Sequence, residues 1–461
     1  MTLRPVLLAV ALALPAFAAP SLEQEEREIL DELLRVDTSH GNETAAVKLV
    51  AARLEAAGVP VQTFESAPGR GNLVARLKGT GAKRPLILLA HLDVVPVDGQ
   101  KWETPPFVPT ERDGYLWARG VSDDKSMAAG FTAIVLEQAR AHAKLSRDLV
   151  LMLTAGEETG GNAGVEWLTQ AHRELFDADL ALNEGGGLQL SPDSSRVQFV
   201  GIGAAEKTFQ SFRLIARGKG GHSSIPPTDV DPAAELGRAL VRVGAYRFPA
   251  HVLPVVKEAF AATARLEAEP LVSAIRDAAA SAPRIAPQDE KVLGQDRIFN
   301  ALIRTTCVTT MLQASPQDNV LPTTAEAVVN CRILPDETPQ GTQAALAAAI
   351  DDPGIEVSPL AGFGTPGGNS PLEGEVTTAI RAATGRSFPG AAVAHQMGTG
   401  ATDSRFLRAV GIAAYGIHSA PGTLDDARKG FGAHGQHERR PVKWLAPGVR
   451  FLRDVTLQVA R

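Results

Sequence analysis

The feature that most constrains this chain is a set of histidine and acidic residues, several of which closely follow short apolar runs. The set comprises His91, Asp123, Glu157, Glu158, Glu184 and His434. A short apolar run bounded by polar residues is typical of a buried strand, and His91 directly follows such a run at Pro85–Ala90. Two imidazoles and several carboxylates suit a pair of zinc-like ions, with one carboxylate left for proton transfer. The set therefore predicts a hydrolase.

Helix and strand patterns alternate along residues 22–200. This alternation is typical of an α/β fold with a mostly parallel central sheet. In such a sheet, ligands bind at the carboxyl ends of the strands. Asp148–Thr154 is expected to be a buried strand shortly before Glu157, as Pro85–Ala90 is directly before His91. The predicted site therefore lies along one edge of the sheet.

The pattern changes near residue 204, where a separate α+β unit is expected to interrupt the first domain. Residues 246–300 are expected to be helical with breaks at prolines, and Ala301–Leu312 and Ala325–Leu334 to be strands. The Gly- and Pro-rich stretch Gly362–Gly368 is expected to lead back to the first domain.

The N-terminus has the pattern of a secretory signal peptide. Arg4 supplies a positive charge, Val6–Leu14 is an apolar stretch too short to span a bilayer, and Ala16–Ala18 is a small-residue cleavage site. A buried helix or a membrane anchor is the alternative, but the acidic run Glu23–Glu28 follows and no stop-transfer pattern does. Cleavage after residues 1–18 is expected to leave a periplasmic or secreted protein without a membrane anchor.

Charge and cysteine content exclude some classes of protein. The net charge is −6 with acidic and basic residues mixed, so no basic stripe suggests nucleic-acid binding. Cys307 and Cys331 are the two cysteines, and their distance in sequence argues against cysteine-bound zinc. Each lies about 12 residues from Asn319, so antiparallel pairing about that turn would bring them together. A disulfide and two buried thiols both remain open.

Two local patterns bear on the chemistry. His91 and Asp93 lie two residues apart, so on an extended chain Asp93 can reach the imidazole and fix its tautomer. Glu157 and Glu158 are adjacent and diverge on an extended chain, so one can bind a metal while the other faces an attacking water. Turn acids and helix caps are the alternatives for isolated carboxylates.

Nine motifs carry a family resemblance. They are HLDVVP, W-x-x-x-PF at Trp102–Phe107, RGVSDDK, GEETG, NEGGG, GHSS at Gly221–Ser224, NVLP at Asn319–Pro322, ATDSRF and HGQHE. In this order they resemble the M20 metallopeptidase family, whose members include carboxypeptidases, aminoacylases, dipeptidases and deacylases. The resemblance implies a zinc-exopeptidase-like catalytic domain at 19–203 and 365–461, interrupted by a smaller α+β lid or dimerisation domain at 204–364.

The resemblance also implies roles for individual residues. Asp123 bridges two metal ions, most simply Zn²⁺, and a cis peptide bond follows it. Glu157 is the general base. The remaining ligands pair as Glu184 with His91 and Glu158 with His434. His437 is a rival for His434, because this chain has Gln436-His437 where the family usually has Pro-Asn.

Three further residues enter through the resemblance. His222 is implied to act across a homodimer interface, donating to the developing oxyanion of the partner's site. Asn319 and Arg332 match positions that bind the substrate's carbonyl and carboxylate. A structural histidine, a turn cap and a surface ion pair are the alternatives for these three residues.

The resulting expectation is a secreted di-zinc hydrolase of small peptides, acting as a carboxypeptidase or dipeptidase. Hydrolysis of N-acyl amino acids is the alternative at the same site. A non-catalytic binding protein is disfavoured because every expected ligand and the base are present. Ala118 and Ser126 replace glycines common in the family, and both are small enough to leave the metal site intact.

Overall fold

The computed structural model describes residues 19–264 and 267–461, so the predicted signal peptide, residues 1–18, lies outside the described part. No helix among the described residues is long and apolar enough to cross a membrane.

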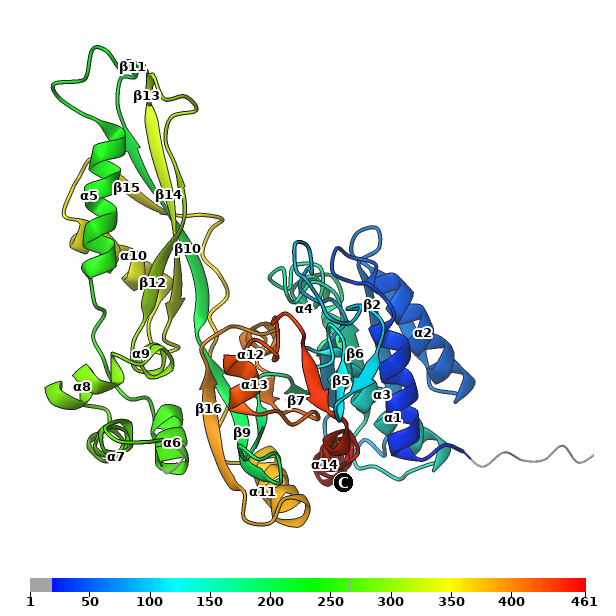
Figure 1. Ribbon diagram of the computed structural model, residues 1–461. Coiled ribbons are helices and arrows are strands. Elements are labelled where there is room, and N and C mark those ends of the chain that lie inside the picture. The colour runs from blue at the N-terminus through cyan, green and yellow to red at the C-terminus, as the bar shows by residue number, and fades with distance from the viewer. Residues whose placement is uncertain (1–18, 265–266) are drawn as a thin grey trace, which may run out of the picture.

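A nine-stranded sheet forms the centre of the main domain (Figure 1). Its order is β1 (Val61–Glu65), β2 (Gly71–Leu77), β6 (Leu149–Thr154), β3 (Leu86–His91), β7 (Leu180–Asn183), β17 (Ala413–Gly416), β9 (Val197–Glu206) and β16 (Ala392–Gly398), with β8 (Gly187–Leu190) beside β9. Strands β6, β3, β7 and β17 are parallel neighbours, while β1 and β2 are antiparallel additions at one edge. The predicted α/β class with a mostly parallel central sheet is therefore confirmed.

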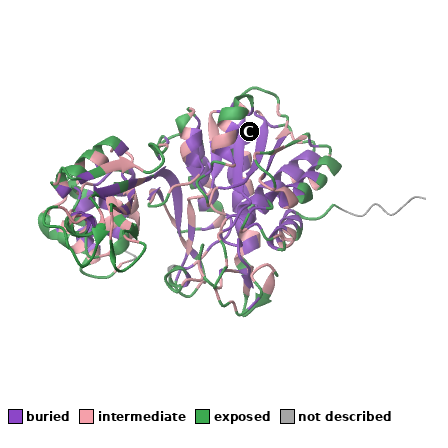
Figure 2. Ribbon diagram, turned by 90° about the horizontal axis from the view of Figure 1, so that it is seen from above, coloured by how far each residue is buried: buried purple, intermediate pink, exposed green. Residues whose placement is uncertain are grey.

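Helices cover both faces of this sheet, which accounts for its buried strands (Figure 2). One face shares a core with α1 (Leu22–Leu34), α2 (Glu43–Ala56), α3 (Lys125–Arg140), α11 (Glu375–Ser387) and α14 (Val442–Ala460). The other packs against α4 (Val165–Ala171), the 3-10 turn Arg173–Phe176 and α12 (Ser404–Ala409). Because both faces are covered, β3 and β6 are apolar along their length rather than alternating.

A second, antiparallel sheet forms the inserted domain. Its order is β12 (Thr306–Gln313), β14 (Thr324–Ile333), β10 (Thr208–Arg217) and β15 (Ile355–Pro359). Buried residues alternate along β14, and α5 (Pro232–Ala245) and α10 (Pro339–Ile350) share the core on its inner face. The short strands β11 (Gly221–His222) and β13 (Val320–Leu321) lie at the tip, away from the main domain (Figure 1).

Four short helices lie at the base of the inserted domain, beside β16 (Figure 1). They are α6 (Pro254–Thr263), α7 (Leu271–Ser281), α8 (Pro287–Leu293) and α9 (Arg297–Ile303). Their core includes Met397 of β16, so this helical unit packs against the edge of the main sheet (Figure 1). The helical prediction for 246–300 is confirmed. The boundaries predicted at 204 and 364 stay a prediction.

The strand predicted at Ala301–Leu312 is wrong at its start. Residues up to Ile303 belong to α9, and β12 begins at Thr306. The side chain of Asp296 caps α9 by accepting from the amides of Ile298 and Phe299. Phe299 and Ile303, four residues apart, are buried in the helical core, which favours helix over strand here.

A disulfide joins the edge strand β12 of the inserted domain to its neighbour β14. Cys307 on β12 and Cys331 on β14 are directly opposite in the antiparallel register, and their Sγ atoms are 2.00 Å apart. The two strands therefore pair antiparallel about the turn near Asn319, as the sequence suggests. Thiols packed without a bond are not what the structure shows.

Candidate active site

The predicted metal ligands gather at the carboxyl ends of parallel strands. His91 is the last residue of β3, Glu158 follows β6, and Glu184 follows β7. Asp123 lies just before α3, and His434 lies in the loop before β18 (Arg439–Pro441), which pairs with β5 (Tyr115–Trp117) and through it β4 (Thr110–Arg112). Segments far apart in sequence thus meet at one edge of the sheet.

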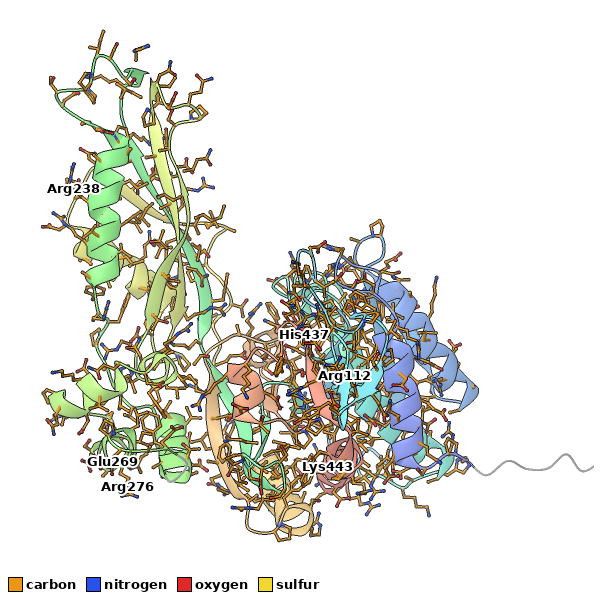
Figure 3. The ribbon with its side chains drawn as sticks, in the orientation of Figure 1. Arg112, Arg238, Glu269, Arg276, His437 and Lys443 are labelled. Atoms are coloured by element: carbon orange, nitrogen blue, oxygen red, sulfur yellow. A yellow bond between two sulfur atoms is a disulfide. The ribbon has the colours of Figure 1, made fainter. Side chains whose placement is uncertain are left out.

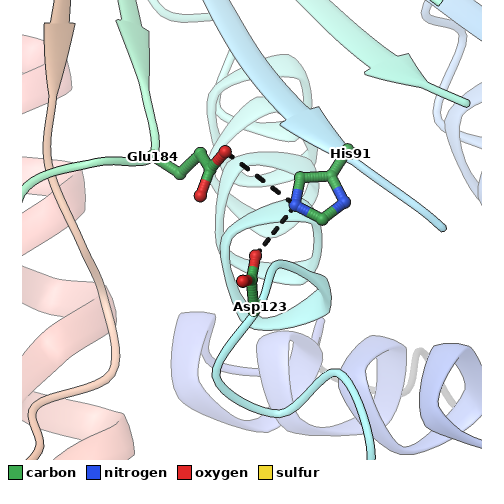
Figure 4. A group of neighbouring side chains, drawn as sticks. All are labelled: His91, Asp123 and Glu184. Atoms are coloured by element: carbon green, nitrogen blue, oxygen red, sulfur yellow. Dashed lines mark hydrogen bonds and ion pairs between the residues drawn. The ribbon is translucent and has the colours of Figure 1, made fainter. Parts of the chain in front are cut away.

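One group of ligands forms around His91 (Figure 4). Its Nε2 atom lies 2.9 Å from Oδ1 of Asp123 and 4.0 Å from Oε1 of Glu184. All three donor atoms are close enough to hold one ion together. This is the pairing of Glu184 with His91 that the resemblance implies.

A second group shares Asp123. Nε2 of His434 lies 3.2 Å from Oδ2 of Asp123 and 2.9 Å from Oε2 of Glu158. Each oxygen of the Asp123 carboxylate therefore faces a different histidine. The peptide bond between Asp123 and Asp124 is cis, as the resemblance implies.

His437 lies outside both groups. Its Nδ1 atom accepts a hydrogen bond of 3.2 Å from the amide of Glu103, and its ring lies edge-on to Trp102. In Figure 3 it lies near Arg112, on the side of the domain formed by the small sheet β4–β5–β18. The geometry therefore favours His434 as the ligand over this rival.

Charge and hydrogen bonding at this site fit divalent cations. The carboxylates of Asp123 and Glu158 raise the pKa of His434 to about 10, so the site attracts positive charge. Burial lowers the pKa of His91, but the carboxylates of Asp123 and Asp93 outweigh it and hold that pKa well above its ordinary value. Oε1 of Glu158 is buried without a hydrogen-bond partner. Imidazole and carboxylate donors are those that zinc accepts.

Asp93 holds the glutamate pair in place. Its carboxylate accepts hydrogen bonds from the backbone amides of Glu157, at 3.1 Å, and Glu158, at 3.0 Å. Nδ1 of His91 lies 3.0 Å from the backbone oxygen of Asp93 and 3.5 Å from its carboxylate. The tautomer of His91 is therefore fixed mainly by the carbonyl, while the carboxylate orients the next loop.

Glu438 holds the loop that carries Asp123. Its carboxylate accepts from the amides of Gly120, at 3.1 Å, and Ser122, at 2.6 Å, and pairs with the buried guanidinium of Arg119 at 2.7 Å. The residue lies directly before β18 and outside both ligand groups, so it acts by holding the loop and not by binding a metal.

A cavity of about 450 Å³ opens over the two groups. Glu157 lines it together with Asp123, Glu158, Glu184 and His434, and burial raises the pKa of the Glu157 carboxyl well above its ordinary value. Arg332, from β14 of the inserted domain, lies in the wall with Phe209, over whose ring its guanidinium lies at 4.7 Å. Arg405, within the ATDSRF motif, also lines the cavity but was not singled out from the sequence.

His222 and Asn319 lie elsewhere. Both are at the exposed tip of the inserted domain, where the amide of Ser223 donates to the backbone oxygen of Asn319 at 3.0 Å. Nδ1 of His222 accepts from the amide of Ser224 at 3.1 Å. Neither residue lines the cavity of its own chain, whereas Arg332 does.

Comparison with known proteins decides the family. The model of peptidase family M20/M25/M40 matches residues 87–458, which is most of the chain. The chain belongs to this family. Its two ligand groups sharing Asp123 therefore form the candidate dinuclear metal site of an M20 peptidase or amidohydrolase.

Two curated relatives illustrate the range of the family. The N-fatty-acyl-amino acid synthase/hydrolase PM20D1 of Xenopus tropicalis is 28% identical over 60% of this chain and 54% of its own length. The succinyl-diaminopimelate desuccinylase of Bordetella petrii is 28% identical over 78% of this chain and 80% of its own. The match thus spans only about half of the Xenopus enzyme.

Solved structures show the same fold for this M20 protein. Human carnosine dipeptidase 1 superposes with a TM-score of 0.68 at 17% identity, over 95% of this chain and 96% of that one. The metallo-carboxypeptidase Sso-CP2 of Sulfolobus solfataricus superposes with a TM-score of 0.68 at 21% identity, over 94% of this chain and 99% of that one. The catalytic plus lid or dimerisation architecture is therefore confirmed.

Proposed function

We propose that this M20 protein is a di-zinc amidohydrolase that cleaves small substrates bearing a free carboxylate beside the scissile amide, with small peptides as the first candidates. The observation that carries the proposal is the shared cavity. Glu157, which is no member of either ligand group, faces the same space as both groups and two arginines. A base, two cation sites and anion-binding side chains converge there.

Arg332 and Arg405 are proposed to recognise the carboxylate. A planar guanidinium matches a carboxylate with two parallel hydrogen bonds. The Arg405 guanidinium donates to the backbone oxygen of Gly160 at 2.8 Å, which fixes it at the cavity wall. Because Arg332 comes from the inserted domain, a bound substrate would contact both domains.

The proton transfers are assigned to Glu157. The two ligand groups would hold the zinc ions, which when bound would supply Lewis-acid polarisation of the substrate carbonyl and a lowered pKa of an attacking water. The Glu157 carboxylate takes a proton from that water and returns it to the leaving amine. Burial raises the pKa of this carboxyl well above its ordinary value, although the charge of His91 acts in the opposite direction, so the group can hold a proton between the two transfers.

N-acyl amino acids are the second candidate substrates. They place an amide beside a free carboxylate as a dipeptide does, so the same residues serve both. The match to an N-fatty-acyl-amino acid synthase/hydrolase and a mainly apolar cavity near the site, described below, favour this candidate.

A substrate screen tests the proposal. The zinc-loaded protein is incubated with a mixed library of dipeptides and N-acyl amino acids, and products are identified by mass spectrometry. We expect hydrolysis of members with a free α-carboxylate and none of their amidated counterparts. Glu157→Gln protein serves as the control for contaminating hydrolases. No turnover of either class in protein carrying its metals would contradict the proposal.

A homodimer through the inserted domain is also proposed. Strand β12 is an edge strand and exposes Val308, Met311 and Leu312, while Val241 is exposed on α5 beside it. An exposed apolar edge is a typical site for pairing with another chain. Analytical ultracentrifugation of the wild type and of Met311→Lys tests this, and a monomeric wild type at micromolar concentration would contradict it.

Export to the periplasm or outside the cell is proposed from the N-terminal sequence, and the Cys307–Cys331 disulfide supports it. Cell fractionation with N-terminal sequencing of the mature chain tests this. Full-length protein retained in the cytoplasm would contradict it.

A further inference from the structure

A second cavity, of about 270 Å³, lies between the helical unit α6–α9 and the edge of the main sheet. Its wall is mainly apolar, with Phe199 from β9, Met397 from β16, Val256 and Phe260 from α6, and Phe299 and Leu302 from α9, but the charged residues Glu267, Asp296 and Arg428 also line it. In Figure 1 these elements lie side by side at the base of the inserted domain. The mechanism proposed above uses none of these side chains.

The loop that follows β16 connects this region to the active site. A small cavity of about 170 Å³ shares Glu184, Gly400, Ala401 and Thr402 with the active-site cavity. Its wall continues to Gly398 at the end of β16, whereas Met397 of β16 and Thr399 of the following loop line the apolar cavity. Residues 397–402, at the end of β16 and in that loop, thus contribute to the walls of all three cavities.

One side chain links the wall of the apolar cavity to the residue after a candidate metal ligand. Gln396 lines the apolar cavity, and its Nε2 atom donates to the backbone oxygen of Gly185 at 3.3 Å. Gly185 directly follows the candidate ligand Glu184. The Gln396 amide lies over Gly201 of β9, where a Cβ would collide with it. Since it is held by this single hydrogen bond, a change of rotamer would move it aside.

We propose that the apolar cavity binds the aliphatic acyl chain of an N-acyl amino acid, which reaches it past Gln396. The proposal rests on the proposed function in its N-acyl form. An acyl chain suits a mainly apolar wall, because its methylenes leave water there. Since a water-sized group occupies about 30 Å³, the cavity takes an acyl chain of roughly eight to ten carbons.

Binding of uncleaved substrates tests the cavity without turnover. Glu157→Gln protein loaded with zinc is titrated calorimetrically with acetyl-, butyryl-, hexanoyl-, octanoyl-, decanoyl- and tetradecanoylglycine. Each buried methylene contributes up to about fourfold in affinity. We expect decanoylglycine to bind at least about 50-fold more tightly than acetylglycine, with no further gain for the tetradecanoyl compound. Equal affinities across the series would overturn the proposal.

Two variants on one helix locate the effect. Ala259 lines the cavity, whereas Ala261 is exposed on the same helix α6. In the Glu157→Gln background, Ala259→Phe fills the cavity and should abolish the dependence on chain length. Ala261→Phe adds the same ring outside the cavity and should retain it. Dependence that survives Ala259→Phe would place the chain elsewhere; if this variant does not fold, the chain-length series alone decides.

The proposal and the proposed function can fail separately. Turnover of acetylglycine and of dipeptides by the wild type reports on the function, while the titrations report on the cavity. Turnover without any chain-length dependence contradicts the cavity alone. Chain-length dependence without turnover contradicts the proposed function alone.

Discussion

The loops of the candidate metal site and the tip of the inserted domain both carry residues that the sequence singles out, but the protein holds them differently. At the metal site, the buried carboxylates of Asp93 and Glu438 accept backbone amides and fix the ligand loops. At the tip, His222 lies on the two-residue strand β11, Asn319 directly precedes the two-residue strand β13, and both are exposed. The metal-site loops are thus held within one chain, whereas the two residues at the tip would need the proposed second chain to reach an active site.

The largest effect is expected at the glutamate pair. Glu157→Gln removes the proton carrier but no ligand, so kcat should fall by about 10²–10⁴ while two metals stay bound. Glu158→Gln removes a donor of the His434 group and should lower metal content instead. Metal analysis of both purified variants decides between the roles. Loss of metal from Glu157→Gln, with retention by Glu158→Gln, would mean that the two are exchanged.

His222→Ala tests the tip. If His222 donates to the oxyanion of a partner's site, its loss should lower kcat by about 10²–10³ without changing metal content. Mixing it with Glu157→Gln should restore about a quarter of wild-type activity, because random pairing gives half heterodimers with one intact site each. Glu157→Gln protein alone is the control. No recovery, with subunit exchange verified by differently tagged chains, would count against action between subunits.

Glu438→Gln tests how firmly the metal-site loops are held. The change leaves the buried guanidinium of Arg119 without its charge partner and should lower the free energy of unfolding by about 3 kcal/mol. Glu373→Gln is a matched control, because Glu373 is 80% exposed and pairs with Arg381 at 3.4 Å. Urea unfolding measures both. Equal effects of the two variants would show that burial of the Glu438 pair is unimportant.

The smallest effect is expected at the disulfide of the inserted domain. The double substitution Cys307→Ser and Cys331→Ser should lower the free energy of unfolding by about 2 kcal/mol, because strands β12 and β14 remain paired through their backbones. Intact mass before and after alkylation under denaturing, non-reducing conditions tests the bond itself. Two reactive thiols in exported wild-type protein would contradict it.

The difference between the two regions also explains what could be predicted from the sequence. Residues at strand ends, such as His91 and Glu184, follow local patterns that place them at one edge of a parallel sheet. Arg405 and Gln396 reach the site or its neighbourhood only through packing of distant segments, which no local pattern records. The apolar faces of helices α6–α9 show that these helices are buried, but not that their partner is the edge of the main sheet. The strand start predicted at Ala301 is wrong for a similar reason, since Ile303 belongs to that helical core.

Metal stoichiometry of purified variants tests the central claim most directly. After zinc loading and removal of free metal, mass spectrometry of the wild type should give two ions per chain. His91→Ala and His434→Ala should each lose one ion, and Asp123→Ala should lose both because the two groups share it. A wild type that binds no zinc, or an Asp123→Ala protein that keeps two ions, would contradict a dinuclear site bridged by Asp123.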